Sequence, residues 1–100
     1  MDAKLTRVDV KAGDYKTLVR QAGDLWHESK VAAHPDAVQD QAIARLELAA
    51  DRARALGLPV AAELHDLASE TAYFLEGVRN GDLLDRPYAP LDEVNWNALT

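Results

Sequence analysis

Three runs of apolar residues at helical spacing, separated by breaks that contain proline, constrain the fold of this chain more than any other feature. A residue before proline avoids the helical region, so the first break falls near His34, which precedes Pro35. Gly57 suits the end of a helix, and Pro59 prevents its continuation. Ala and Leu head the helix propensity scale and supply 32 of the 100 residues. The predicted helices span residues 15–33, 35–56 and 59–79.

The first predicted helix has one apolar face, and the second has two. The face of the first consists of Tyr15, Leu18, Val19, Ala22, Leu25, Trp26, Ser29 and Ala33. The second helix carries a main stripe of Val38, Ala42, Leu46, Ala49, Ala53 and Leu56, and a second stripe of Ala37, Ala44, Leu48 and Ala55. Two apolar faces on one helix predict a central place in a bundle or contact with a partner chain. Gly23 lies inside the first helix and costs up to ~1 kcal/mol there, unless a neighbouring helix needs the space.

The third predicted helix carries a regular seam of Val60, Leu64, Leu67, Thr71, Phe74 and Val78, widened by Ala68 and Leu75. Residues 1–13 read as a short arm; residues 5–10 partly alternate like a strand, but one strand without a partner is not stable alone, so the arm is expected to be a flexible or docking segment. Residues 80–100 read as a tail with one short helical turn near 91–94, or as an extended tail that packs on the bundle or binds a partner. Short connections between helices favour antiparallel neighbours. We therefore predict one all-α domain over residues 1–100, an up-down-up three-helix bundle with a short N-terminal arm and an acidic, partly irregular C-terminal tail.

Composition excludes several classes of protein. The chain has no cysteine, which removes disulfide scaffolds, thiolate zinc sites, iron–sulfur clusters and cysteine nucleophiles. No apolar run approaches the ~20 residues of a membrane helix, and no signal-peptide pattern opens the chain. The expectation is a cytoplasmic protein that does not bind membranes.

No group of residues in the sequence favours catalysis or metal binding. The histidines, His27, His34 and His65, match neither the Glu-x-x-His pairs of di-iron bundles nor His-Glu-x-x-His. Ser29 and Ser69 lie inside predicted helices, whereas a serine nucleophile needs a strained turn and an oriented histidine. We predict that the chain is not an enzyme and has no catalytic, metal-binding or cofactor-binding residue.

The segment around Gly57 is similar to the turn of a helix-turn-helix, with Ala53 four residues before the glycine. That resemblance implies DNA binding by the helix that follows. This helix carries Glu63, Asp66, Glu70 and Glu76, with no Lys or Arg before Arg79. Carboxylates that face phosphates oppose binding, so the prediction is that the chain does not bind nucleic acid.

The residues His34, Pro35 and Asp36 match the tripeptide of the J-domain co-chaperones and fall between two helices as they do there. The resemblance implies a co-chaperone role. J-domains carry a basic helix before the tripeptide, whereas Lys30 is the one Lys or Arg in the last two turns of the helix predicted here. Pro35 at the first helical position and Asp36 near the positive end of the helix dipole explain the same residues without that role.

Charge is distributed unevenly along the chain. The net charge of −6 results from +2 over residues 1–20, −2 over residues 21–61 and −6 over residues 62–100. An acidic C-terminal half attracts basic protein surfaces and repels phosphates. On the third predicted helix, Asp66, Glu70 and Tyr73 share one flank, an arrangement that suits an aromatic anchor among carboxylates.

The predicted function is protein binding to a basic surface, as an inhibitor, an immunity or antitoxin-like factor, or an adaptor. The alternative is a self-associating structural or assembly protein that forms a homodimer through the second stripe of helix 35–56. Trp96 is either a lid over the bundle or a binding anchor. The predicted partner-binding residues are Asp66, Glu70, Tyr73, Tyr88 and Trp96.

Overall fold

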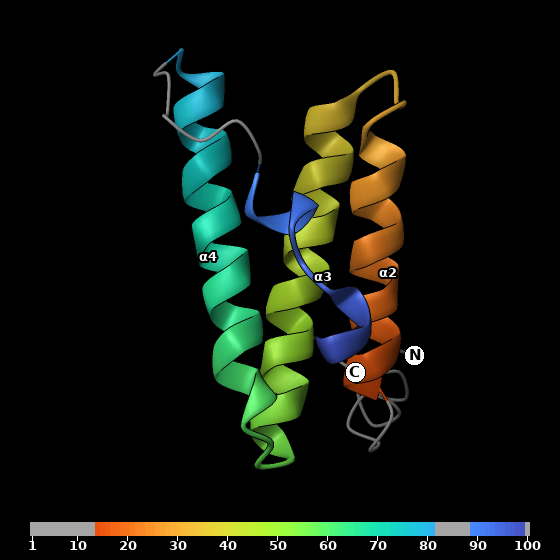
Figure 1. Cartoon of the computed structure of the whole chain (residues 1–100), viewed down its shortest axis with the longest axis vertical. Coiled ribbons are helices and arrows are strands. Elements are labelled where there is room, and N and C mark those ends of the chain that lie inside the picture. The colour runs from red at the N-terminus through yellow and green to blue at the C-terminus, as the bar shows by residue number, and fades with distance from the viewer. Residues whose placement is uncertain (1–13, 82–88, 100) are drawn as a thin grey trace, which may run out of the picture.

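The computed structural model describes residues 14–81 and 89–99, and these residues form helices and turns with no strand among them. The elements are α2 (Asp14–Ser29), α3 (Pro35–Ala55), α4 (Val60–Arg79) and two 3-10 turns, η1 (Pro90–Asp92) and η2 (Trp96–Leu99). Successive long helices run antiparallel, and α3 lies between α2 and α4 (Figure 1). The predicted all-α three-helix bundle is confirmed. The predicted N-terminal arm, residues 1–13, lies outside the described residues.

The buried face of α3 consists mainly of small side chains. Its buried residues are Ala42, Leu46, Ala49, Ala50 and Ala53. Because the distance between packed helices depends on the side chains at the contact, this alanine surface allows α2 and α4 to approach α3 closely on both sides. The second predicted stripe does not cause the central position, because Ala37, Ala44 and Ala55 are exposed and Leu48 is only half-buried.

The first helix is shorter than predicted, because it ends at Ser29 and not at residue 33. The Ser29 hydroxyl donates a hydrogen bond to the Trp26 carbonyl at 2.6 Å. Beyond it, the amides of Lys30 and Val31 bond three residues back, at 3.2 and 3.1 Å, as in the tight last turn of a helix. The predicted face therefore extends too far, and Ala33 is exposed.

The buried seam of α4 is offset from the predicted one. The buried residues are Ala61, Leu64, Ala68, Thr71 and Leu75. Leu67 and Phe74 are half-buried, and Val78 at the end of the predicted seam is 52% exposed. Leu56 is likewise more exposed than predicted, because α3 ends at Ala55 and the chain turns at Gly57, whose φ of 73° is unfavourable for side-chain-bearing residues.

Residues 89–99, here called the C-terminal segment, fold back across the bundle between α4 and α2 (Figure 1). Its η1 turn packs on α4 and its η2 turn packs on α2. Ala89, Leu91 and Leu99 are buried in the common core. The predicted tail is therefore a packed part of the bundle over these residues, with two short turns where one was predicted.

The presence of glycine at position 23, inside α2, is explained by close packing of the C-terminal segment and not by a neighbouring helix. A Cβ atom at Gly23 would lie 3.1 Å from Cδ2 of Trp96, which is closer than real Cβ atoms normally come to a neighbour. The indole ring of Trp96 thus rests against the backbone of α2, and the ring is half-buried. Trp96 therefore packs on α2, and its role as a binding anchor stays a prediction.

Candidate functional site

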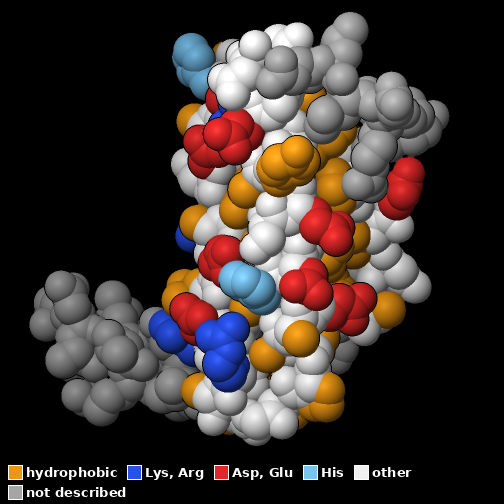
Figure 2. Space-filling view, turned by 90° about the vertical axis from the view of Figure 1, so that its left-hand side faces the viewer, with side chains coloured by type: hydrophobic (Ala, Val, Ile, Leu, Met, Phe, Trp, Pro, Cys, Tyr) orange, Lys and Arg blue, Asp and Glu red, His pale blue; other side chains and the backbone are white. Residues whose placement is uncertain are grey.

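The outer side of α4 carries a continuous acidic surface. Glu63, Asp66, Glu70 and Tyr73, here called the acidic flank, recur at spacings of three and four and so share one side of the helix. All four are exposed, and Tyr73 keeps 73% of its surface in solvent. Acidic side chains gather along the middle of this side of the molecule, and basic ones are most visible at its lower end (Figure 2).

The carboxylates of the acidic flank have no cation paired with them among the described residues. Within residues 14–81 and 89–99, the ion pairs join Lys30 to Asp92, Arg54 to Asp51, His65 to Glu47, and Arg79 to Asp36 and Asp40. None involves Glu63, Asp66 or Glu70. Within the described residues, cationic side chains therefore pair with carboxylates of α3 and of the C-terminal segment, and not with those of the acidic flank.

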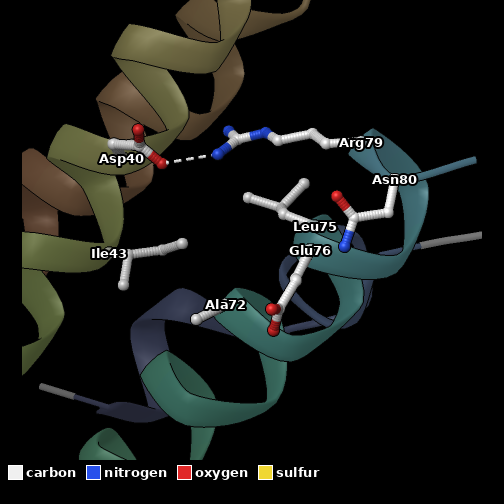
Figure 3. Close-up of a pocket in the computed structure, with 7 residues that line it drawn as sticks. All are labelled: Asp40, Ile43, Ala72, Leu75, Glu76, Arg79 and Asn80. Atoms are coloured by element: carbon white, nitrogen blue, oxygen red, sulfur yellow. Dashed lines mark hydrogen bonds and ion pairs between the residues drawn. The ribbon is translucent and has the colours of Figure 1, made fainter.

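Arg79 shows how this chain uses a cation between two helices. From the end of α4 its guanidinium reaches Asp40 on α3 at 3.0 Å (Figure 3). The guanidinium also reaches Asp36, on the same helix, at 3.3 Å. It also donates to the Asp36 carbonyl at 3.2 Å and to Gln39 at 3.3 Å. Beside it is a hollow of about 310 Å³ with Ile43, Ala72 and Leu75 in its wall. The one Arg of α4 is therefore engaged within the fold.

A second hollow, of about 340 Å³, lies between α4 and the C-terminal segment. Its lining residues are Glu63, Leu67, Glu70, Pro90, Glu93, Val94, Asn95, Ala98 and Leu99. It therefore borders the acidic flank, and Glu93 adds a third carboxylate from a distant part of the sequence. Its lining includes no Lys or Arg from residues 14–81 and 89–99.

Asp92 anchors the C-terminal segment. Its Oδ1 accepts hydrogen bonds from Trp26 Nε1 at 2.8 Å and from Lys30 Nζ at 2.7 Å, and its Oδ2 accepts the Ala89 amide at 3.1 Å. Burial of the carboxylate raises its pKa, but the hydrogen bonds from Lys30 and Trp26, the charge of Lys30 and the Ala89 amide outweigh burial. The pKa of Asp92 therefore lies below its ordinary value.

We expect acid to loosen the C-terminal segment. Because the pKa of Asp92 is lower in the folded chain, its contribution to stability is complete above the ordinary carboxyl range, about pH 4, and is lost as the pH falls further. Urea unfolding of the wild type and of Asp92→Asn between pH 7 and 2.5 measures this contribution. The difference in unfolding free energy should shrink towards low pH, and a difference independent of pH would contradict the prediction.

The predicted partner-binding residues fall into three groups. Asp66, Glu70 and Tyr73 lie together on the acidic flank. Trp96 lies apart from them, against Gly23 on α2, and Tyr88 is outside the described residues. The sequence analysis missed the role of Asp92, because its contacts with Lys30 and Trp26 span 62 and 66 residues and leave no local pattern.

Two of the three histidines that were considered as metal ligands contact other groups of the chain. His27 Nδ1 lies 2.8 Å from the Gly23 carbonyl, and His65 Nδ1 lies 3.1 Å from Glu47. Within the part of the chain described, no three His, Asp or Glu side chains form a group that could hold a metal ion. No helix in this part is long and apolar enough to cross a membrane.

Comparison with known proteins adds no further constraint on the site. No family model, curated protein or solved structure matches the chain. The acidic flank of α4, with its exposed carboxylates and Tyr73, is the feature of the described chain that most favours binding of another molecule.

Proposed function

We propose that this protein is an acidic protein-binding module that uses the acidic flank of α4 to bind a basic surface on another protein. Such a module would act as an inhibitor, an immunity or antitoxin-like factor, or an adaptor. One observation carries the proposal: Tyr73 is 73% exposed on the same flank as Asp66 and Glu70, carboxylates that no cation of the described chain neutralises. Large exposed aromatic side chains near charged groups are frequent anchors in protein interfaces.

Binding would proceed in two physical steps. The unpaired carboxylates attract a basic surface over roughly one Debye length, about 8 Å at physiological salt, and orient it before contact. Tyr73 then becomes buried in the partner and loses its contact with water, while its hydroxyl remains available for a hydrogen bond. The charges would thus govern the association rate, and the tyrosine would govern the lifetime of the complex.

The opposite side of α4 keeps this surface rigid. Leu64, Ala68 and Thr71 are fully buried against the bundle, so the acidic flank does not need to fold on binding. A surface that is already ordered loses less conformational entropy when a partner docks. This favours direct docking of a folded partner over coupled folding and binding.

Site-specific photo-cross-linking in the native cell tests the proposal. With p-benzoylphenylalanine in place of Tyr73, we expect a cross-link to one protein with a basic surface, and no such product from the same residue at exposed Ala44 on α3. The double variant Asp66→Lys/Glu70→Lys should abolish the product. The matched control is Asp24→Lys/Glu28→Lys, which makes the same charge change four residues apart on exposed sites of α2.

Two results would contradict the proposal. One is a cross-linked partner whose contact surface is acidic, since the flank would repel it. The other is equal loss of the product in both double variants, which would mean that total charge matters and the flank does not.

Self-association is the second candidate, because Ala37, Ala44 and Ala55 form an exposed apolar stripe along α3. Light scattering across a dilution series separates the two functions. A monomer throughout the series would exclude a homodimer through α3.

A further inference from the structure

We propose that the hollow between α4 and the C-terminal segment is a pocket for one arginine side chain of the partner. This inference rests on the proposed function, since it names the chemical group that the acidic flank would recognise. The hollow measures about 340 Å³ and borders the flank through Glu63 and Glu70. It differs from a bare acidic cluster because its wall also contains apolar side chains of Leu67, Val94 and Leu99.

The lining suits both parts of an arginine side chain. An arginine carries an apolar stem of three methylene groups and a planar guanidinium with five donors. The stem can lie along the apolar wall, while the carboxylates of Glu63, Glu70 and Glu93 accept from the guanidinium. Lysine offers a compact charge and fewer donors, so it would satisfy fewer of the three carboxylates.

The molecule already contains an arrangement of this kind. Arg79 lies beside the hollow between α3 and α4, with Leu75 and Ile43 in the wall, and its guanidinium pairs with Asp40 (Figure 3). It also pairs with Asp36. A third hollow, of about 320 Å³, between the helices and η1 includes Asp36 and Asp92 in its lining together with Lys30 and Arg79. In both of these hollows a cation of the chain accompanies the carboxylates. Among the described residues, the lining of the pocket at the acidic flank contains carboxylates and no Lys or Arg, and this difference points to a cation from a partner.

The C-terminal segment completes the pocket. It supplies Glu93, Val94, Asn95, Ala98 and Leu99, which make up one wall. The hydrogen bonds of Asp92 to Trp26 and Lys30 hold this wall in place. Detachment of the segment would therefore remove the pocket and leave the residues of the flank on α4.

Titration of the full chain with short peptides, followed by amide NMR, tests the inference. The probe is acetyl-Gly-Arg-Gly-amide, and the control peptide contains citrulline, which has nearly the same shape without the charge. We expect the arginine peptide to shift the amides of Leu67, Glu70 and residues 93–99 in a saturable way. The lysine peptide should bind more weakly, and the citrulline peptide should not bind.

Two matched pairs of variants separate the pocket from general electrostatics. Ala98→Phe fills the pocket without a change of charge, and Ala62→Phe adds the same ring at an exposed site of α4 outside the pocket. Glu93→Gln removes one lining charge, and Glu28→Gln removes one exposed charge on α2. We expect Ala98→Phe and Glu93→Gln each to weaken arginine binding by about tenfold, as for the loss of one charge-assisted contact, and the controls to change it less than about twofold.

The arginine pocket would be contradicted if the citrulline and arginine peptides bound equally well. It would also be contradicted if each pocket variant weakened peptide binding no more than its matched control. Its failure can be distinguished from failure of the proposed function. If the cross-linked partner still requires Asp66 and Glu70 but binds Ala98→Phe normally, only the pocket is wrong. If neither the peptide nor a partner binds at α4, both are wrong.

Discussion

Replacement of Asp92 by Ala should lower the free energy of unfolding by about 2 kcal/mol, because this side chain accepts charge-assisted hydrogen bonds from Trp26 in α2 and from Lys30 just after it. The change also leaves Trp26 Nε1 without its acceptor, which is costly because Trp26 is only 1% exposed to water. The C-terminal segment should then detach in part. Urea unfolding gives the energy, and hydrogen exchange of the amides of Leu91 and Leu99 reports the detachment.

Glu93→Ala is the control for Asp92→Ala, because the neighbouring Glu93 is exposed and has no ion pair within the described chain. It should change the unfolding free energy by no more than about 0.5 kcal/mol. Equal effects of the two variants would show that Asp92 does not anchor the C-terminal segment.

Replacement of Trp26 by Ala should have the largest effect on stability, a loss of about 3–5 kcal/mol. Trp26 is the largest fully buried side chain, and it lies at the junction of α2 with the C-terminal segment. A domain of this size has a total stability of about 5–15 kcal/mol, so the variant should lose a large fraction of it. Chemical denaturation followed by far-ultraviolet circular dichroism measures the loss.

Trp26→Phe separates the two contributions of this side chain. Phenylalanine keeps most of the buried apolar volume but cannot donate the 2.8 Å hydrogen bond to Asp92. It should therefore cost about 1–2 kcal/mol, clearly less than Trp26→Ala. If the two variants are equally destabilised, burial of the ring is not what holds this junction together.

Local signals in the sequence were sufficient to predict the bundle. As predicted, α3 begins at Pro35 and α4 ends at Arg79. Gly57 lies in the turn between these two helices, also as predicted. The end of α2 was missed, because it depends on the Ser29 hydroxyl and tight backbone bonding rather than on apolar spacing. Apolar spacing shows which face of a helix can be buried, but it does not show how far the helix continues.

The candidate site was predictable only in part. Helical spacing placed Asp66, Glu70 and Tyr73 together, since residues three and four apart share a face. The approach of Glu93 to α4 depends on the path of the C-terminal segment, which is set by contacts between residues more than 60 positions apart. Gly23 did suggest that a neighbouring helix needs the space beside the first helix, but nothing in the local sequence identified the neighbour as Trp96.

The association rate constant of the cross-linked partner, measured against ionic strength, tests the central claim most directly. The account predicts that the wild-type rate constant falls as salt rises, and that Asp66→Asn/Glu70→Gln lowers it by about tenfold at low salt and flattens the dependence. Tyr73→Ala should leave that rate constant nearly unchanged and accelerate dissociation. A rate constant that is independent of salt, or equally salt-dependent in the wild type and the Asp66→Asn/Glu70→Gln variant, would show that the acidic flank does not guide binding.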